Sequence, residues 1–129
     1  MKTLDQIRAS YAWKRLDQDA RANSKEYRNL AKSMPALVMT NGLLQALAFL
    51  KSKERNDKKR KEYDWLIQDI VGWLGHEEVG VLSGDGLDWE AATQELIGLE
   101  PAEYRRATEE TLGVLKWIRQ FADARGGEE

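Results

Sequence analysis

The chain of 129 residues is long enough for one domain with its own hydrophobic core, and its 42% hydrophobic and 33% charged residues are typical of a folded protein. It contains no cysteine, which excludes disulfides and thiolate chemistry and favours a reducing compartment, so we expect a soluble, cytoplasmic protein. The polar start and the shortness of every apolar run argue against a secretory signal and against a membrane span.

The net charge of −2 conceals an unequal distribution. Residues 1–76 hold 15 Lys and Arg against 9 Asp and Glu, a net charge of +6, and residues 77–129 hold 5 against 13, a net charge of −8. A molecule with a basic half and an acidic half can stack head to tail on copies of itself, or place its basic side on a polyanion. The alternative is that solvated faces differ in charge by chance.

Apolar residues at helical spacing predict a first helix over 3–20 with two apolar stripes on opposite sides. One stripe holds Leu4, Ile7 and Tyr11, and the other holds Ala9, Trp13, Leu16 and Ala20. A helix on the outside of a monomer needs only one apolar face. Either this helix is sandwiched within the fold or one stripe contacts a partner, so we predict a partner interface at Trp13 and Leu16.

A second helix is expected to begin at Asn23, where Glu26 is spaced to complete a capping box. Proline lacks an N–H group and disfavours a helical residue before it, so the helix is expected to kink or restart at Pro35. The block from Met34 to Leu50 is apolar apart from three side chains. These are Thr40, Asn41 and Gln45.

Within this block, Gly42 is expected to end one helix and start the next, because glycine adopts a left-handed conformation at little cost. The turns from Leu43 to Leu50 are apolar almost all the way round, which predicts a buried helix. The block lacks ionisable groups, and this argues for a role in the core rather than in catalysis.

A basic segment, Lys51–Lys61, follows with seven Lys and Arg against two acidic residues, a net charge of +5. Cations grouped on one side of a helix neutralise phosphates without reading the base sequence. We therefore predict nucleic-acid contacts at Lys51, Lys53, Arg55, Lys58, Lys59, Arg60 and Lys61. The alternative is a lysine-rich, solvated start of a helix.

A strong helix is predicted from Asp57 to a stop at Gly75. Its apolar face holds Tyr63, Leu66, Ile67, Ile70 and Leu74. Trp65 falls on the opposite face, near Lys58 and Lys61 by helical spacing. An outward tryptophan can stack on a base or fill a partner's pocket, and we predict Trp65 as a partner-interface residue. The alternative is that the glycine-rich segment after the helix covers it.

Four glycines in residues 75–87 predict a flexible connector with few core residues. Asp88 is expected to cap a short helix that ends near Ile97, and Pro101 to begin a last helix that ends near Ala124. Residues 126–129 are expected to be frayed. The fold class is therefore all-α: a compact single-domain bundle of five to six helices over residues 1–125, without a β-sheet.

No residue pattern predicts catalysis. His76 is the only histidine, and we expect it to be solvated at a helix end. A Ser–His–acid triad would have to use it, and no serine lies in a nucleophile-elbow sequence. The glycine-rich segment lacks both the Lys-Ser/Thr of a phosphate loop and the spacing of a calcium loop. We therefore expect no enzymatic activity, no metal and no cofactor.

The segment from Tyr27 to Lys51 resembles the core of the small subunit of type III-B CRISPR–Cas effectors, the Cmr RNA-targeting complexes. The points of likeness are Pro35-Ala36-Leu37, Thr40-Asn41-Gly42-Leu43 and Gln45-Ala46-Leu47-Ala48-Phe49-Leu50. Flanking likeness at Leu4–Trp13 and Tyr104–Ala122 extends the resemblance over nearly the whole chain, and residues 75–87 match least.

This resemblance implies a non-catalytic helical bundle that stacks in several copies beside the backbone subunits of the effector. Its basic surface would face the duplex of guide RNA and target RNA, while cleavage and the other activities would belong to the backbone and large subunits. Two alternatives compete with it. One is a free-standing helical adaptor that binds another protein and no nucleic acid, and the other is a small enzyme, which needs a convergent polar pocket.

Overall fold

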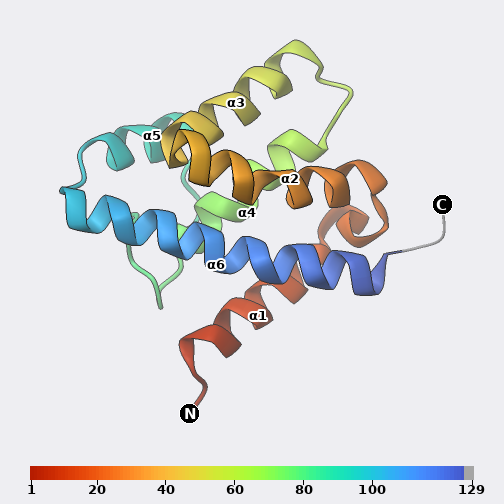
Figure 1. Ribbon diagram of the computed structural model, residues 1–129, viewed down its shortest axis with the longest axis horizontal. Helices are drawn as coiled ribbons and strands as arrows, with labels where there is room; N and C mark the ends of the chain where they lie inside the picture. The colour runs from red at the N-terminus through yellow and green to blue at the C-terminus, as the bar shows by residue number, and fades with distance from the viewer. Residues whose placement is uncertain (127–129) are drawn as a thin grey trace.

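The computed structural model describes residues 1–126, which form six α-helices, one 3-10 helix and no strand, and this confirms the predicted all-α class. In chain order the elements are α1 (Leu4–Leu16), η1 (Gln18–Asn23), α2 (Lys25–Asn41), α3 (Leu43–Asn56), α4 (Glu62–Leu74), α5 (Trp89–Ile97) and α6 (Pro101–Arg125). Helix α6 runs the length of the molecule, with α1 on one side, α2 on the other, and α3 and α5 beyond α2 (Figure 1). None of the helices in residues 1–126 is long and apolar enough to cross a membrane.

Helix α1 begins as predicted but ends four residues early. The side chain of Thr3 accepts a hydrogen bond from the backbone of Gln6, whose own side chain accepts from the backbone of Thr3, and this capping box fixes the start. After Leu16 the chain turns into η1, where Asp19 and Ala20 have positive φ angles of 53° and 57°. The prediction of a helix to residue 20 is wrong because the chain turns inward here and buries Arg21.

The start of α2 also differs from the prediction. Ser24, not Asn23, is the N-cap, since its hydroxyl accepts from the N–H of Tyr27. The helix does not restart at Pro35 and continues to Asn41. Gly42 then separates α2 from α3 as predicted, with a φ of 91° and its N–H donated to the carbonyl of Val38.

Helix α3 is only partly buried, which corrects the prediction for residues 43–50. Leu43, Leu47 and Leu50 are buried, whereas Ala48 is exposed and Phe49 is 39% exposed. The helix also extends to Asn56, so Asp57 is its C-cap rather than the start of α4. Helix α4 begins at Glu62, and its predicted apolar face is buried in the core.

The connector 75–87 is a loop, as predicted, but it contributes to the core. Val79, Val81 and Leu82 are buried, and the N–H groups of Val81 and Leu82 donate to the carbonyl of Leu74 at 3.0 Å. A Cβ on Gly75 would lie 1.9 Å from the carbonyl oxygen of Gly84. The segment is therefore packed against the end of α4, and the expectation of a flexible connector with few core residues is wrong.

The boundaries of the last two helices agree closely with the prediction. Asp88 caps α5, accepting from the N–H of Ala91 at 2.8 Å, and Pro101 occupies the first position of α6. The inner face of α6 is buried, namely Ala107, Thr111, Val114, Leu115, Ile118 and Ala122. Of the predicted frayed tail, Gly126 lies beyond the last helix and residues 127–129 lie outside the described residues.

A buried carboxylate on α4 joins four elements. Asp69 is fully buried and accepts from Arg15 Nε at 2.6 Å on α1, from Arg21 at 3.2 Å on η1 and from the Tyr27 hydroxyl at 2.5 Å on α2. Burial raises the pKa of Asp69, and the two arginines and Tyr27 oppose this by favouring the charged form. Burial also raises the pKa of the Tyr27 hydroxyl, so it stays protonated and donates.

A second carboxylate joins α1, α4 and α6. Glu110 on α6 receives two hydrogen bonds from the guanidinium of Arg8, at 3.1 and 3.0 Å, and a third from the indole N–H of Trp73 at 3.1 Å. The bidentate pairing raises the pKa of Arg8. Together Asp69 and Glu110 fix the position of α1 against α4 and α6.

We expect Asp69→Ala to lower the free energy of unfolding by about 3–5 kcal/mol, because the buried Arg21 would keep only the exposed carboxylate of Asp19, 3.5 Å away, as an ion-pair partner. Urea denaturation of the full chain measures this difference. The matched control is Asp123→Ala, which removes the half-exposed partner of Lys32 at 3.3 Å and should cost less than about 1 kcal/mol. Equal, small losses for the two variants would contradict the role given to Asp69.

Candidate nucleic-acid interface

The basic segment 51–61 spans the end of α3, the α3–α4 loop and the residue before α4. The loop is held by its own backbone, since the N–H of Asp57 donates to the carbonyl of Lys53 and the N–H of Arg60 donates to the carbonyl of Asp57. The side chain of Asp57 also accepts from the N–H of Lys59 at 3.3 Å. The seven cations therefore lie on one continuous segment, the end of α3 and the α3–α4 loop, which projects from the bundle beyond α2 (Figure 1).

Two of the seven cations are paired with carboxylates. Lys51 lies 3.2 Å from Glu54 and 6.0 Å from the ring of Trp89. Arg60 pairs with the buried carboxylate of Glu62 and lies 4.9 Å from the ring of Tyr63, and the contact with Glu62 raises the pKa of Arg60. These two side chains hold the local structure as well as carrying charge.

The other five cations have no carboxylate within ion-pair distance among residues 1–126. All five are exposed: Lys53, Arg55, Lys58, Lys59 and Lys61. Of these five, only Lys53 has its charged group over an aromatic ring within residues 1–126, with its ammonium 5.5 Å from the ring of Phe49. This set, which we call the free cations, carries a charge of +5 that the described part of the chain does not neutralise.

Trp65 lies beside the free cations, in a cavity of about 360 Å³. Its lining comes from the start of α2 and from the α3–α4 loop with the start of α4: Ser24, Glu26, Lys59, Arg60, Lys61, Glu62 and Trp65. No residue of the connector 75–87 lines this cavity; the connector instead runs back along α4 and contributes to the separate cavity that Gln68 lines. On the interior side, Arg21 lies 5.5 Å and Tyr27 6.2 Å from the indole.

Of the two residues predicted to form a partner interface on α1, only Trp13 is accessible at the surface. Leu16 is buried in the chain's own core, so it presents no surface to a partner. Trp13 is 46% exposed, with its ring edge-on to Phe121 at 5.1 Å and the guanidinium of Arg125 at 4.0 Å from its centroid. Trp13 therefore gives α1 a small apolar outer surface, while Leu4, which is 38% exposed, lies on the opposite side of the helix.

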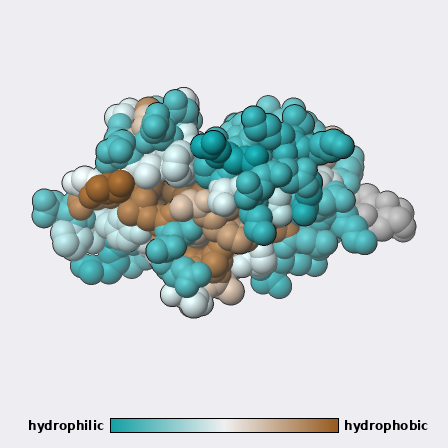
Figure 2. Space-filling view, turned by 90° about the horizontal axis from the view of Figure 1, so that it is seen from above, coloured by the Kyte–Doolittle hydropathy of each residue, from teal (hydrophilic) through white to brown (hydrophobic). Residues whose placement is uncertain are grey.

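An apolar groove between α3 and α5 is a feature that the sequence reasoning missed. Adjoining cavities of about 340 and 310 Å³ share Ala48 and Trp89 in their walls. One end is apolar, with Leu44 and the 61% exposed Ile97, and the other is basic, with Lys51 and Arg55. Apolar surface crosses this face of the molecule (Figure 2). The spacing of Leu44, Ala48, Lys51 and Arg55 on one side of α3 is the signal in the sequence.

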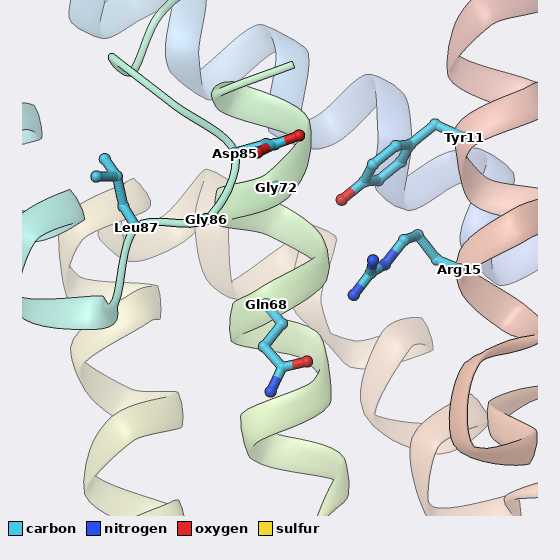
Figure 3. A pocket seen from close by; sticks show the side chains of 7 residues that line it. All are labelled: Tyr11, Arg15, Gln68, Gly72, Asp85, Gly86 and Leu87. Carbon is cyan, nitrogen blue, oxygen red and sulfur yellow. The ribbon is translucent and has the colours of Figure 1, made fainter.

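The cavity between α1 and α4, about 380 Å³, is the best candidate for an active site, and its polar groups are already engaged. Tyr11 and Arg15 point from α1 towards α4, and Asp85 faces them from the connector (Figure 3). The Tyr11 hydroxyl donates to the carbonyl of Asp69 at 2.8 Å, and Arg15 is paired with the side chain of Asp69. Burial raises the pKa of Tyr11. The cavity therefore holds no positioned pair of nucleophile and base.

His76 lies outside this cavity's lining and is half-buried rather than solvated as expected. Its ring lies 5.1 Å from that of Trp73 and edge-on to Tyr11 at 6.0 Å, and its Nδ1 accepts from the N–H of Glu78. Within residues 1–126, no three His, Cys, Asp or Glu side chains are grouped so that they could hold a metal ion.

Comparison with known proteins gives two consistent results. Residues 4–125 match a family described as CRISPR-associated protein (Cas_Cmr5). A curated relative, "CRISPR system Cmr subunit Cmr5" from Thermus thermophilus, is 32% identical over 125 residues, which cover 96% of this chain and 96% of the relative. The match includes the apolar block, the basic segment and the last helix.

The two classes of cation should respond differently to substitution. We expect Arg60→Gln to lower the free energy of unfolding more than a substitution of a neighbouring lysine, because it leaves the buried carboxylate of Glu62 without its partner. Lys59→Gln, at the preceding residue and free of ion pairs within residues 1–126, should change it by no more than about 0.5 kcal/mol. Thermal or urea unfolding of the two variants checks this, and equal stabilities would show that Arg60 has no structural role.

Proposed function

Since the chain belongs to the Cmr5 family of CRISPR-associated proteins, we propose that it is the non-catalytic small subunit of a type III-B RNA-targeting effector complex in the cytoplasm. In this proposal several copies stack along the backbone subunits. The free cations contact the duplex of guide RNA and target RNA, and the backbone and large subunits carry the catalytic activities.

The main observation in favour of an RNA contact is that the five free cations lie together at the end of α3 and on the α3–α4 loop. Lys53, Arg55, Lys58, Lys59 and Lys61 are exposed and unpaired within the described residues, although the remainder of the chain is net acidic. Unneutralised cations next to one another gain from displacing the counterions of a phosphate backbone. Contacts of this kind do not select a base sequence, which suits a subunit that must accept any guide and target.

Two different apolar surfaces support the stacking of copies. One is formed by Trp13 on α1, and the other is the groove between α3 and α5. Helix α1 lies on one side of α2 and α6, and α3 and α5 lie on the other side (Figure 1). Two different contact surfaces on opposite sides of one subunit generate head-to-tail rather than closed two-fold assemblies. The basic end of the groove, at Lys51 and Arg55, also suits an acidic neighbour, and the C-terminal part of the chain is acidic.

The free-standing adaptor remains the competing proposal, and the same groove is the observation that favours it. An adaptor would use the α3–α5 groove for a partner protein and leave the free cations in solvent. Purification of the native protein from its host separates the two. The subunit proposal requires co-purifying small RNA and several larger subunits, and their absence would favour the adaptor.

The RNA contact is tested by charge reversal of Lys58, Lys59 and Lys61 to Glu, leaving Arg60 in place because it pairs with Glu62. We expect the reconstituted complex to bind target RNA at least tenfold more weakly at low salt. We also expect the slope of log affinity against log salt concentration to become shallower by about 2, as for two to three lost phosphate contacts. Filter binding at several salt concentrations measures both quantities.

The matched control reverses Lys2, Lys116 and Arg119, which are exposed and form no ion pair within the described residues. It has the same net charge as the test variant but places the change on α6 and the N-terminus. Both complexes should retain their full set of subunits on gel filtration. Equal affinity and salt slope in the two variants would rule out a specific RNA contact by the α3–α4 loop.

A further inference from the structure

We propose that the cavity beside Trp65 binds one unpaired nucleotide, with the base on the indole and the adjacent phosphate on Lys59 and Lys61. The inference rests on the proposed function and adds to it a ligand class, single-stranded RNA, at a defined place on the basic surface. It is carried by the combination of an accessible aromatic ring, a cavity and unpaired cations.

The shape of the site suits a single base better than a continuous duplex. The cavity of about 360 Å³ falls at the lower end of the range for small-molecule sites, about 300–1,000 Å³. In a duplex both faces of every base are stacked on neighbours, so a recessed indole can reach only a base that is unpaired or turned out. Stacking on an aromatic ring accepts any base, because every base has a π-face.

The indole is held in position from the interior. Arg21 and Tyr27, both fully buried, lie on its inner side, and they are themselves fixed by Asp69. Trp65 therefore has little freedom to rotate into the cavity or away from it. A preorganised ring loses little entropy when it binds a base.

The charges around the cavity favour one phosphate. Lys59 and Lys61 line it, are exposed and have no ion pair within residues 1–126. Glu62 is buried and paired with Arg60, and Glu26 is an exposed carboxylate that water screens. Two free lysines thus face one solvated carboxylate, which leaves a net positive wall for a single nucleotide phosphate.

The test compares Trp65→Leu with wild type in binding to two probes, a fluorescent 12-nucleotide oligouridine and a fluorescent 12-base-pair RNA duplex. We expect Trp65→Leu to weaken oligouridine binding about tenfold and to leave duplex binding unchanged, with Trp65→Phe restoring most of the loss. The control Trp13→Leu removes an exposed tryptophan outside the cavity and should bind both probes like wild type. Circular dichroism checks that each variant is folded.

A second measurement needs no destabilising variant. In NMR spectra of the wild-type chain, titration with uridine 5′-monophosphate should shift the indole N–H resonance of Trp65 more than those of the other four tryptophans, the resonance being assigned with Trp65→Phe. No shift at Trp65, or a shift equal to that of Trp13, would overturn the inference.

The outcomes separate this inference from the proposed function. If Trp65→Leu binds oligouridine like wild type while the reversal of Lys58, Lys59 and Lys61 still weakens RNA binding, the nucleotide site is wrong and the RNA-contacting surface stands. If Trp65→Leu binds both probes like wild type and the reversal of Lys58, Lys59 and Lys61 leaves target-RNA binding by the complex unchanged, both the nucleotide site and the RNA-contacting surface are wrong. Equal weakening of oligouridine and duplex by Trp65→Leu also overturns the nucleotide site, because it shows a general effect on the basic surface.

Discussion

The arrangement of this helical bundle depends on one buried carboxylate, that of Asp69 on α4. It receives Arg15 from α1, Arg21 from η1 and Tyr27 from α2, and so fixes three segments of the N-terminal half against one central helix. Removing any partner would leave charge in the interior, which makes this arrangement far more sensitive than the surrounding apolar contacts. The left-handed residues Asp19 and Ala20 in η1 are part of the same turn that buries Arg21.

The ion pairs with the buried carboxylates of Asp69 and Glu110 determine which cations remain unpaired at the surface. Arg8, Arg15 and Arg21 are engaged by Glu110 and Asp69, so the arginines of the first helix and η1 are structural. The lysines of the α3–α4 loop have no such partners within residues 1–126. The net charge of +6 in residues 1–76 is therefore not spread over the surface of the N-terminal half, because several of its arginines are paired in the interior. The unpaired positive charge is concentrated on the α3–α4 loop and the end of α3.

Local signals in the sequence were sufficient for most of the fold. Gly42, Asp88 and Pro101 act through their own backbone or side-chain chemistry, so the boundaries that they mark were predicted correctly. Two errors arose where distant contacts decide, at the end of α1 and in the connector that packs on α4. The late start of α4 follows from local hydrogen bonds around Asp57, which the helix-forming residues of this loop did not reveal. The same holds for the candidate site, because the basic segment could be predicted from the sequence alone. The cavity at Trp65, the burial of Leu16 and the α3–α5 groove required the tertiary structure.

The central claim is that the α3–α4 loop, with its free cations, lies against RNA in the assembled effector. It is tested most directly by photo-crosslinking the reconstituted complex, using target RNA that carries 4-thiouridine, and identifying the modified peptides by mass spectrometry. We expect crosslinked peptides of this subunit within residues 53–65. Crosslinks confined to α1 and α6, with residues 53–65 unmodified, would contradict it.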